Sequence, residues 1–216
     1  MNRIASITLL AVFVLGFSTP FEGQAATIIY GPRPIPREFK SWSLFLICNP
    51  GWVVAEKDQQ VSKLYDRFLG FGWAIGRENS AVWFWKRESP TISAQNVDVE
   101  RSARFCKAYN LKPSRSPYLL ITTTYPTEDS AMSKVDHAIF ELGKMTPEEV
   151  TDLLAKLTDD LLLKGRVQTQ VPAPGPSIYA RVVDELLSSA QSLNCKWSLK
   201  LITPLLTAES RPCEKR

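Results

Sequence analysis

The sequence is poor in the side chains that most enzymes use to hold metals or to activate nucleophiles. Its 216 residues include one histidine, His137, and four cysteines, and none of them shows a C-x-x-C or H-x-x-x-H ligand spacing. No metal and no cofactor is therefore predicted. His137 lies in a stretch where apolar and polar residues alternate, without a nucleophile motif beside it, so we expect it to be structural or at the surface.

A nucleotide-binding loop is also missing. Gly70, Gly72 and Gly76 have the spacing G-x-G-x-x-x-G after a predicted helix, whereas a dinucleotide-binding loop has G-x-G-x-x-G between a strand and a helix. No G-K-[ST] follows them. We expect these glycines to form a turn that ends the helix.

Charge of one sign is not concentrated anywhere along the chain. The 26 Lys and Arg residues are interspersed with 22 Asp and Glu residues, and the formal net charge is +4. This pattern is typical of a solvated surface and does not favour a nucleic-acid partner.

No apolar run is long enough to span a bilayer comfortably. The longest, residues 7–17, follows Arg3 and precedes the small residues Gly23 and Ala25, which is the pattern of a cleaved signal peptide. Pro20 and Gly23 disfavour the alternative, an uncleaved membrane anchor. We predict a signal peptide over 1–25, a mature chain without a transmembrane segment, and a location in the periplasm of a bacterium or otherwise outside the cell.

Export places the four cysteines in an oxidising compartment, where they can pair. Cys195 and Cys213 can close a short C-terminal loop, which leaves Cys48 and Cys106 as a candidate core pair, but the sequence leaves all three pairings open. Cys106 falls on the apolar side of a predicted helix. A buried, inert thiol is the interpretation we favour for it.

Hydrophobic periodicity and turn residues predict an alternation of strands and helices. A Pro-rich arm over 26–40 precedes the first predicted strand, and a Pro-rich linker over 166–177 precedes a C-terminal extension over 178–216. The predicted strands are 41–48, 81–85, 118–124, 138–142 and 197–202. The first predicted helix has Asp58 as its cap and runs to Gly70. Three further helices are predicted over 99–109, over 146–164 with a Thr146–Glu149 capping box, and over 179–193.

The segment Tyr109-Asn110-Leu111-Lys112-Pro113-Ser114-Arg115-Ser116-Pro117-Tyr118-Leu119-Leu120-Ile121 resembles the thioredoxin-like pattern of a helix, a short loop, a cis-proline and an apolar strand. The resemblance implies an α/β three-layer sandwich with a central mixed sheet over 41–165, and a cis peptide bond before Pro117. The chain departs from the pattern by two extra loop residues and by Ser116, where the family usually has an apolar residue.

Catalytic members of that family carry Cys-x-x-Cys at the start of the helix after the first strand, where the helix dipole and the second thiol favour a thiolate. The corresponding stretch here is Cys48-Asn49-Pro50-Gly51-Trp52, which has one cysteine. We therefore predict a redox-inactive module that binds another protein, in envelope assembly or secretion. Enzymatic activity stays open, although less favoured.

Two alternatives belong to other functional classes. The first is a thiol-disulfide oxidoreductase or isomerase that uses Cys48, Cys106 or both. The second is a small-molecule carrier that uses a face formed by Trp83 and Trp85, although core packing is the favoured interpretation of these two residues.

Overall fold

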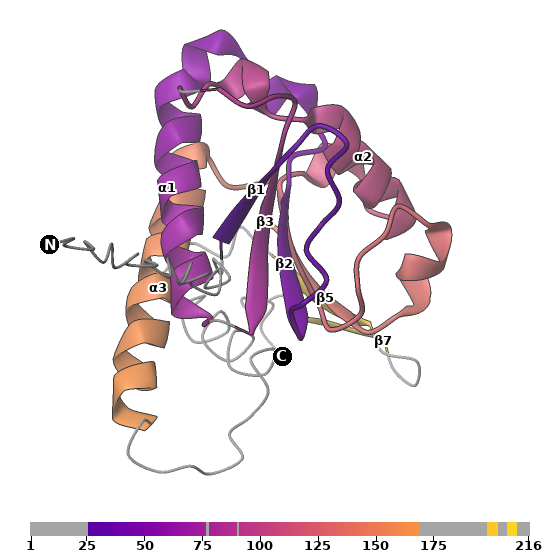
Figure 1. Ribbon diagram of the computed structural model, residues 1–216, viewed down its shortest axis with the longest axis vertical. Helices are drawn as coiled ribbons and strands as arrows, with labels where there is room; N and C mark the ends of the chain where they lie inside the picture. Colours follow the sequence, from indigo (N-terminus) through magenta and orange to yellow (C-terminus); the bar gives the residue numbers. More distant parts are fainter. Residues whose placement is uncertain (1–25, 77, 90, 169–197, 203–206, 211–216) are drawn as a thin grey trace, which may run out of the picture.

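The computed structural model describes residues 26–76, 78–89, 91–168, 198–202 and 207–210 as an α/β fold around one mixed sheet (Figure 1). The sheet has seven strands in the order β1-β3-β2-β4-β5-β6-β7. The strands are β1 (Ala26–Tyr30), β2 (Ser41–Leu46), β3 (Asn79–Trp85), β4 (Tyr118–Thr122), β5 (His137–Glu141), β6 (Ser198–Ile202) and β7 (Thr207–Ser210). The α-helices are α1 (Asp58–Ala74), α2 (Val99–Ala108) and α3 (Pro147–Gln168).

Strand β2 is the central strand on which the sheet changes direction. It pairs in parallel with β3 and antiparallel with β4, and β1 extends the parallel part beyond β3. Strands β5, β6 and β7 continue the sheet from β4 in antiparallel pairs. All six residues of β2 are buried, because a central strand is covered by helices or loops on both faces.

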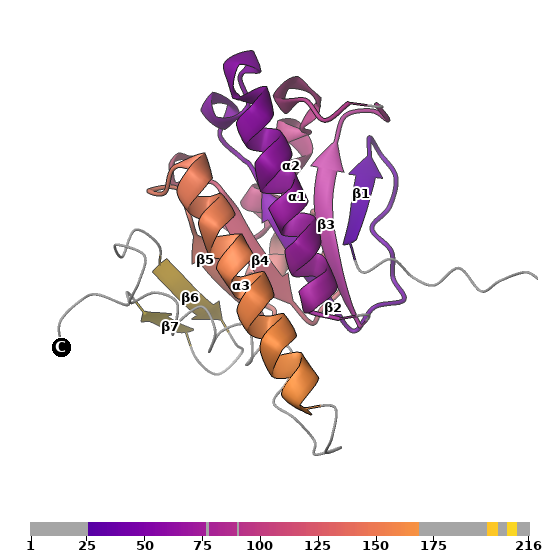
Figure 2. The same ribbon diagram turned by 90° about the vertical axis from the view of Figure 1, so that its left-hand side faces the viewer.

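Helices α1 and α3 lie side by side on one face of the sheet, and α2 lies on the other face (Figures 1 and 2). The alternation of side chains along β2 divides the core accordingly. Phe45 and Ile47 face the α1 and α3 side, whereas Leu44, Leu46 and Cys48 face the α2 side. The helices and the sheet thus form three layers with two hydrophobic clusters.

Trp83 and Trp85 of β3 are buried in the cluster under α1, at 1% and 2% exposure. Trp83 stacks on Phe45 with ring centroids 4.9 Å apart, and Tyr65 of α1 meets both tryptophans edge-on. The prediction that the two tryptophans pack in the core is confirmed. Their burial also leaves no open aromatic face for the small-molecule carrier that the sequence left as an alternative.

Two helices continue through the glycines that the sequence analysis took for stops. Helix α1 passes Gly70 and Gly72 and ends at Ala74, and α3 passes Gly165 to end at Gln168. At Gly70 the helix packs on α3, and a Cβ built there would lie 3.6 Å from the Thr158 side chain, an ordinary van der Waals contact. A glycine in a helix costs about 1 kcal/mol, which tertiary packing readily offsets.

Strand ends and caps differ from the predictions in detail. Strand β2 ends at Leu46, so Cys48 follows the strand and is not its last residue. Asp58 is the first residue of α1 and does not cap it; its carboxylate accepts hydrogen bonds from Ser93 Oγ and the Ala94 amide instead. The capping box of α3 is confirmed, since the Thr146 amide donates to Glu149 Oε2 and the Glu149 amide to Thr146 Oγ1.

The segments outside the predicted core add strands to the same sheet. The Pro-rich arm begins with β1, and the C-terminal extension contributes β6 and β7. Sequence analysis predicted β6 but neither β1 nor β7. The predicted signal peptide and the predicted helix 179–193 lie outside the described residues.

Arg101 of α2 ties the end of β1 to the α2 side of the sheet. Its side chain is buried, its guanidinium lies 4.6 Å from the centre of the Phe84 ring, and it donates a hydrogen bond to the Gly31 carbonyl. Burial lowers the pKa of Arg101, although the Glu128 carboxylate 3.7 Å away opposes this effect. The buried guanidinium thus supplies a hydrogen-bond donor to the Gly31 carbonyl, directly after the end of β1.

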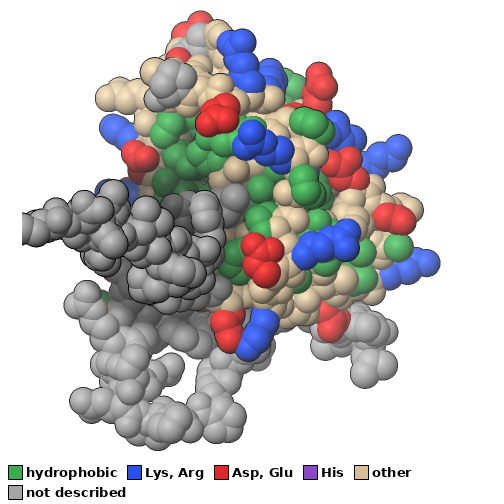
Figure 3. Space-filling view, in the orientation of Figure 1, with side chains coloured by type: hydrophobic (Ala, Val, Ile, Leu, Met, Phe, Trp, Pro, Cys, Tyr) green, Lys and Arg blue, Asp and Glu red, His purple; other side chains and the backbone are tan. Residues whose placement is uncertain are grey.

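Among the described residues, no helix combines the length and the apolar character that crossing a bilayer requires. Figure 3 shows acidic and basic side chains mixed over one face of the molecule, with hydrophobic side chains between them. This face therefore carries no extended patch of purely positive or purely negative charge.

The two glycines Gly70 and Gly143 give a matched pair of alanine substitutions. A Cβ at Gly143 would collide with the backbone of Arg115, whereas a Cβ at Gly70 meets only ordinary van der Waals contacts. We expect Gly143→Ala to lower the free energy of unfolding by about 1–3 kcal/mol and Gly70→Ala to raise it by about 0.5–1 kcal/mol. Urea unfolding of both variants tests this, and the opposite order of stabilities would contradict the packing described for Gly143.

Candidate functional site

A disulfide joins Cys48, two residues after β2, to Cys106 of α2. The alternation of β2 turns Cys48 towards α2, and the spacing of Ser102, Phe105 and Cys106 turns Cys106 towards the sheet. The two residues are 3% and 1% exposed. Cys106 is therefore buried, as expected, and it is bonded to Cys48, the candidate core pair that the sequence left open. The favoured interpretation of Cys106 as a thiol is wrong.

The loop before β4 lies against the same end of β2. Ser116 is buried, and its hydroxyl accepts a hydrogen bond from the Cys48 amide at 2.7 Å and lies 3.5 Å from the Leu46 carbonyl oxygen. The Ser116–Pro117 peptide bond is cis. The serine that looked like a departure from the family pattern thus has a local role, because its hydroxyl satisfies a backbone amide that has left the strand ladder.

A third loop completes this end of the sheet. The Leu142 amide donates to the Pro117 carbonyl at 2.9 Å, and Gly143 packs directly on the Arg115 backbone. The Arg115 guanidinium holds Glu141 at 3.1 Å from both carboxylate oxygens. These contacts fix the loop that carries Pro117 between the ends of β2 and β5.

The chain leaves the disulfide through a tight turn and then exposes one apolar side chain, that of Val54. Asn49 Oδ1 accepts from the Gly51 amide at 2.9 Å, which closes the turn that Asn49-Pro50-Gly51 predicted. Trp52 and Val53 are half-buried against the core, and Val54 is 40% exposed. The Lys57 ammonium lies 5.8 Å from the centre of the Trp52 ring. We call residues 52–54 the apolar loop.

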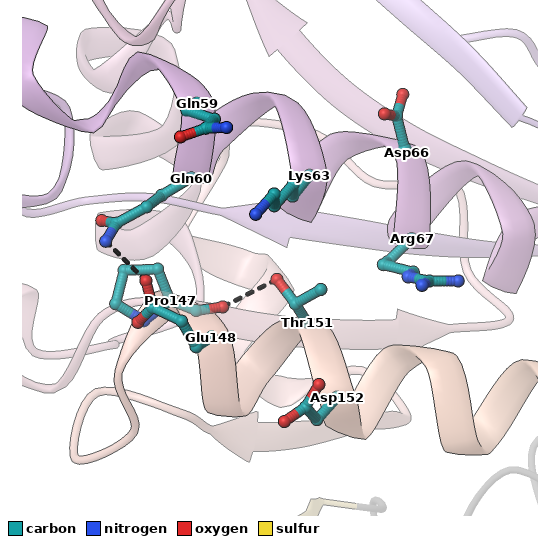
Figure 4. A pocket seen from close by; sticks show the side chains of 9 residues that line it. All are labelled: Gln59, Gln60, Lys63, Asp66, Arg67, Pro147, Glu148, Thr151 and Asp152. Atoms are coloured by element: carbon teal, nitrogen blue, oxygen red, sulfur yellow. Dashed lines mark hydrogen bonds between the residues drawn. The ribbon is translucent and has the colours of Figure 1, made fainter.

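A polar groove lies at the start of α1, which a 3-10 turn, Ala55–Lys57, joins to residues 52–54. It has a volume of about 560 Å³ and lies between the first turns of α1 and α3 (Figure 4). Gln60 donates to Glu148 across the groove at 2.5 Å, and Lys63 and Arg67 line its α1 side opposite Asp152. Sequence reasoning missed this groove, because its two walls are 88 residues apart at Gln60 and Glu148.

His137 lies in β5, away from the disulfide, and is fully buried. Its Nδ1 lies 2.7 Å from the Val135 carbonyl, and the Tyr109 ring meets it edge-on with centroids 5.0 Å apart. Of the two expected roles, structural or surface, the structure supports the structural one. Cys195 and Cys213 lie outside the described residues.

The arrangement has two parts with different chemical capacities. The disulfide, Ser116 and Pro117 form a buried unit, which disfavours thiol-disulfide exchange because exchange requires access to a sulfur atom. The apolar loop exposes Val54 to solvent, and the groove between α1 and α3 presents cationic and anionic groups together. No group of His, Cys, Asp and Glu side chains suited to a metal ion occurs within the described part of the chain.

No protein-family model, no curated protein and no solved structure matches this chain.

The disulfide closes a long loop, since its two cysteines are separated by 58 positions. Loop-closure entropy gives such a bond a stabilising effect of about 4 kcal/mol. We therefore expect the Cys48→Ala/Cys106→Ala double variant to lose several kcal/mol, on the order of 4, in urea unfolding at neutral pH. A loss below about 1 kcal/mol would mean that the bond does not constrain the unfolded chain as described.

Burial lowers the pKa of His137, and the positive charge of Lys200 acts in the same direction, against the effect of the Val135 hydrogen bond. An unfolded histidine takes up a proton near pH 6.5, but the folded chain resists it. The contribution of the neutral His137 to the free energy of unfolding is therefore fully present above that pH and is lost as the pH drops below it. Unfolding free energies at pH 7.5 and 5.5 should differ more in the native sequence than in His137→Gln; equal differences would contradict this.

Proposed function

We propose that the chain is an exported, redox-inactive thioredoxin-like module that binds another protein through the apolar loop, in envelope assembly or secretion. One observation carries the proposal: a buried disulfide fixes the end of the central strand, and the turn that follows it leads to the exposed side chain of Val54. The bond supports the loop and is not accessible to a substrate.

The order of the elements supports the thioredoxin-like part of the proposal. Between β2 and α3 the chain runs strand, helix, strand, helix, strand, strand, helix, and the four strands lie in the order β3-β2-β4-β5. Among these four strands, only β2 and β3 pair in parallel, whereas β2 with β4 and β4 with β5 pair antiparallel. The resemblance implied a cis-proline at Pro117, and the bond before it is cis.

The position of the disulfide supports redox inactivity. An exchange-active pair keeps one sulfur at the start of a helix and open to solvent, so that a thiolate can form and attack. Cys48 instead faces the sheet side of α2, its partner comes from within that helix, and Cys48 Sγ lies 3.3 Å from the Ser102 carbonyl. The bond therefore has the surroundings of a structural bridge.

The composition of the apolar loop supports a protein partner. Trp52 presents a large, rigid ring with a cation beside it, Val54 is one of the few large apolar side chains exposed in the described residues, and the groove offers charges of both signs. Aromatic anchors surrounded by polar groups are typical of protein interfaces. Export follows from the predicted signal peptide, which places the partner in the periplasm of a bacterium or outside the cell.

Insulin reduction tests the redox part of this proposal. We expect no turnover above the rate of the reductant alone, for the native sequence and for Cys48→Ser alike, because neither sulfur is accessible. Turnover that Cys48→Ser abolishes would replace the proposal with the oxidoreductase or isomerase that uses Cys48 and Cys106.

Photo-cross-linking in the native host tests the binding part. A photoreactive residue at Val54 should give a discrete cross-linked partner, and the same residue at the exposed Lys107 of α2 should not. Excess native protein should compete with the cross-link, whereas Val54→Asp should compete at least about tenfold less well. Equal cross-linking from both positions, or equal competition by both proteins, would exclude the apolar loop as the interface.

A further inference from the structure

A second cavity lies on the opposite side of the sheet from the groove between α1 and α3. It has a volume of about 390 Å³ and is lined by residues of the end of α2, the loop that follows it, the segment before β5, and strands β5 and β6. Leu111, Ile139 and Ile202 are the aliphatic residues of this lining, and Ile139 is buried. A cavity of this size is at the small end of those that bind organic ligands.

Three cationic side chains line this cavity: Lys112, Arg115 and Lys200. The carboxylate among the lining residues, Glu141, is already held by Arg115 and accepts a hydrogen bond from Ser198 Oγ at 2.9 Å. Lys112 and Lys200 form no ion pair with any carboxylate of the described side chains. Among the described side chains, these two ammonium groups therefore have no carboxylate partner.

His137 adds a buried polar atom beside the cavity. It shares a face of β5 with Ile139 and Glu141, its register partner on β6 is Ile202, and the Tyr109 ring that contacts it also lines the cavity. Its Nδ1 is used by Val135, while its Nε2 has no hydrogen-bond partner. A buried nitrogen without a hydrogen-bond partner is rare in proteins. The NMR signals of this imidazole are therefore expected to shift when a charged ligand binds nearby.

We propose that this cavity binds a small organic anion, a carboxylate joined to an unbranched apolar body. The carboxylate lies between Lys112 and Lys200, which form charge-assisted hydrogen bonds with its oxygens. The apolar body lies against Leu111, Ile139 and Ile202. This site is separate from the apolar loop, so it does not depend on the proposed protein partner.

Monomeric octanoate is the probe, and the imidazole NMR signals of the full-length protein are the readout, because His137 is the single histidine of the chain. We expect a saturable shift of these signals with octanoate. Butyrate should bind at least about fivefold more weakly, since it leaves the apolar walls in contact with water. Inorganic phosphate should produce no saturable shift at the same concentration.

Charge variants separate a specific site from general binding. Lys112→Gln/Lys200→Gln should weaken octanoate at least about tenfold, whereas Lys86→Gln, an exposed lysine at the end of β3, should leave it unchanged. Glu209 of β7 stands opposite Lys200 in the strand register, so Glu209→Gln should not weaken binding. An absent shift, an equal shift with octanamide, or equal affinity in the double lysine variant would overturn the proposal.

Discussion

The bond between Cys48 and Cys106 is the constraint on which this end of the molecule depends. It joins the end of the central strand to α2, and so holds two layers together through cysteines 58 positions apart in sequence. Ser116 then hydrogen-bonds the Cys48 amide, and Gly143 packs on the loop before Pro117. Three loops from distant parts of the chain therefore have one fixed arrangement.

The buried disulfide bears on both parts of the proposed function, thiol-disulfide exchange and the binding of a protein partner. A disulfide buried between β2 and α2 can fix the direction in which residues 49–54 leave the strand, and its burial limits the access of thiols from solution. The exposed Val54 and the half-buried Trp52 lie immediately beyond the turn that follows it. The same geometry thus favours a binding surface and disfavours a redox centre, which is why the proposed function combines the two statements.

Sequence periodicity predicted the central elements because each has a strong local signal, such as the apolar run of β2 and the Thr146–Glu149 box of α3. It did not predict β1 or β7, which are short edge strands, nor the path of α1 through Gly70, where the helix packs on α3. The choice of Cys106 as the partner of Cys48 depends on long-range packing, and the groove and the cavity depend on residues brought together by the fold. Such sites could not be predicted, because their residues are far apart in the sequence and form no motif with a regular spacing.

The central claim is that the Cys48–Cys106 bond is a structural bridge, and the kinetics of its reduction test it most directly. The rate of bond loss with dithiothreitol can be followed by alkylation and peptide mass mapping at increasing urea concentrations below the unfolding transition. A buried bridge predicts a rate that rises with urea in parallel with the unfolding rate, because the chain must open first. A rapid rate without urea, proportional to dithiothreitol and insensitive to denaturant, would contradict the account.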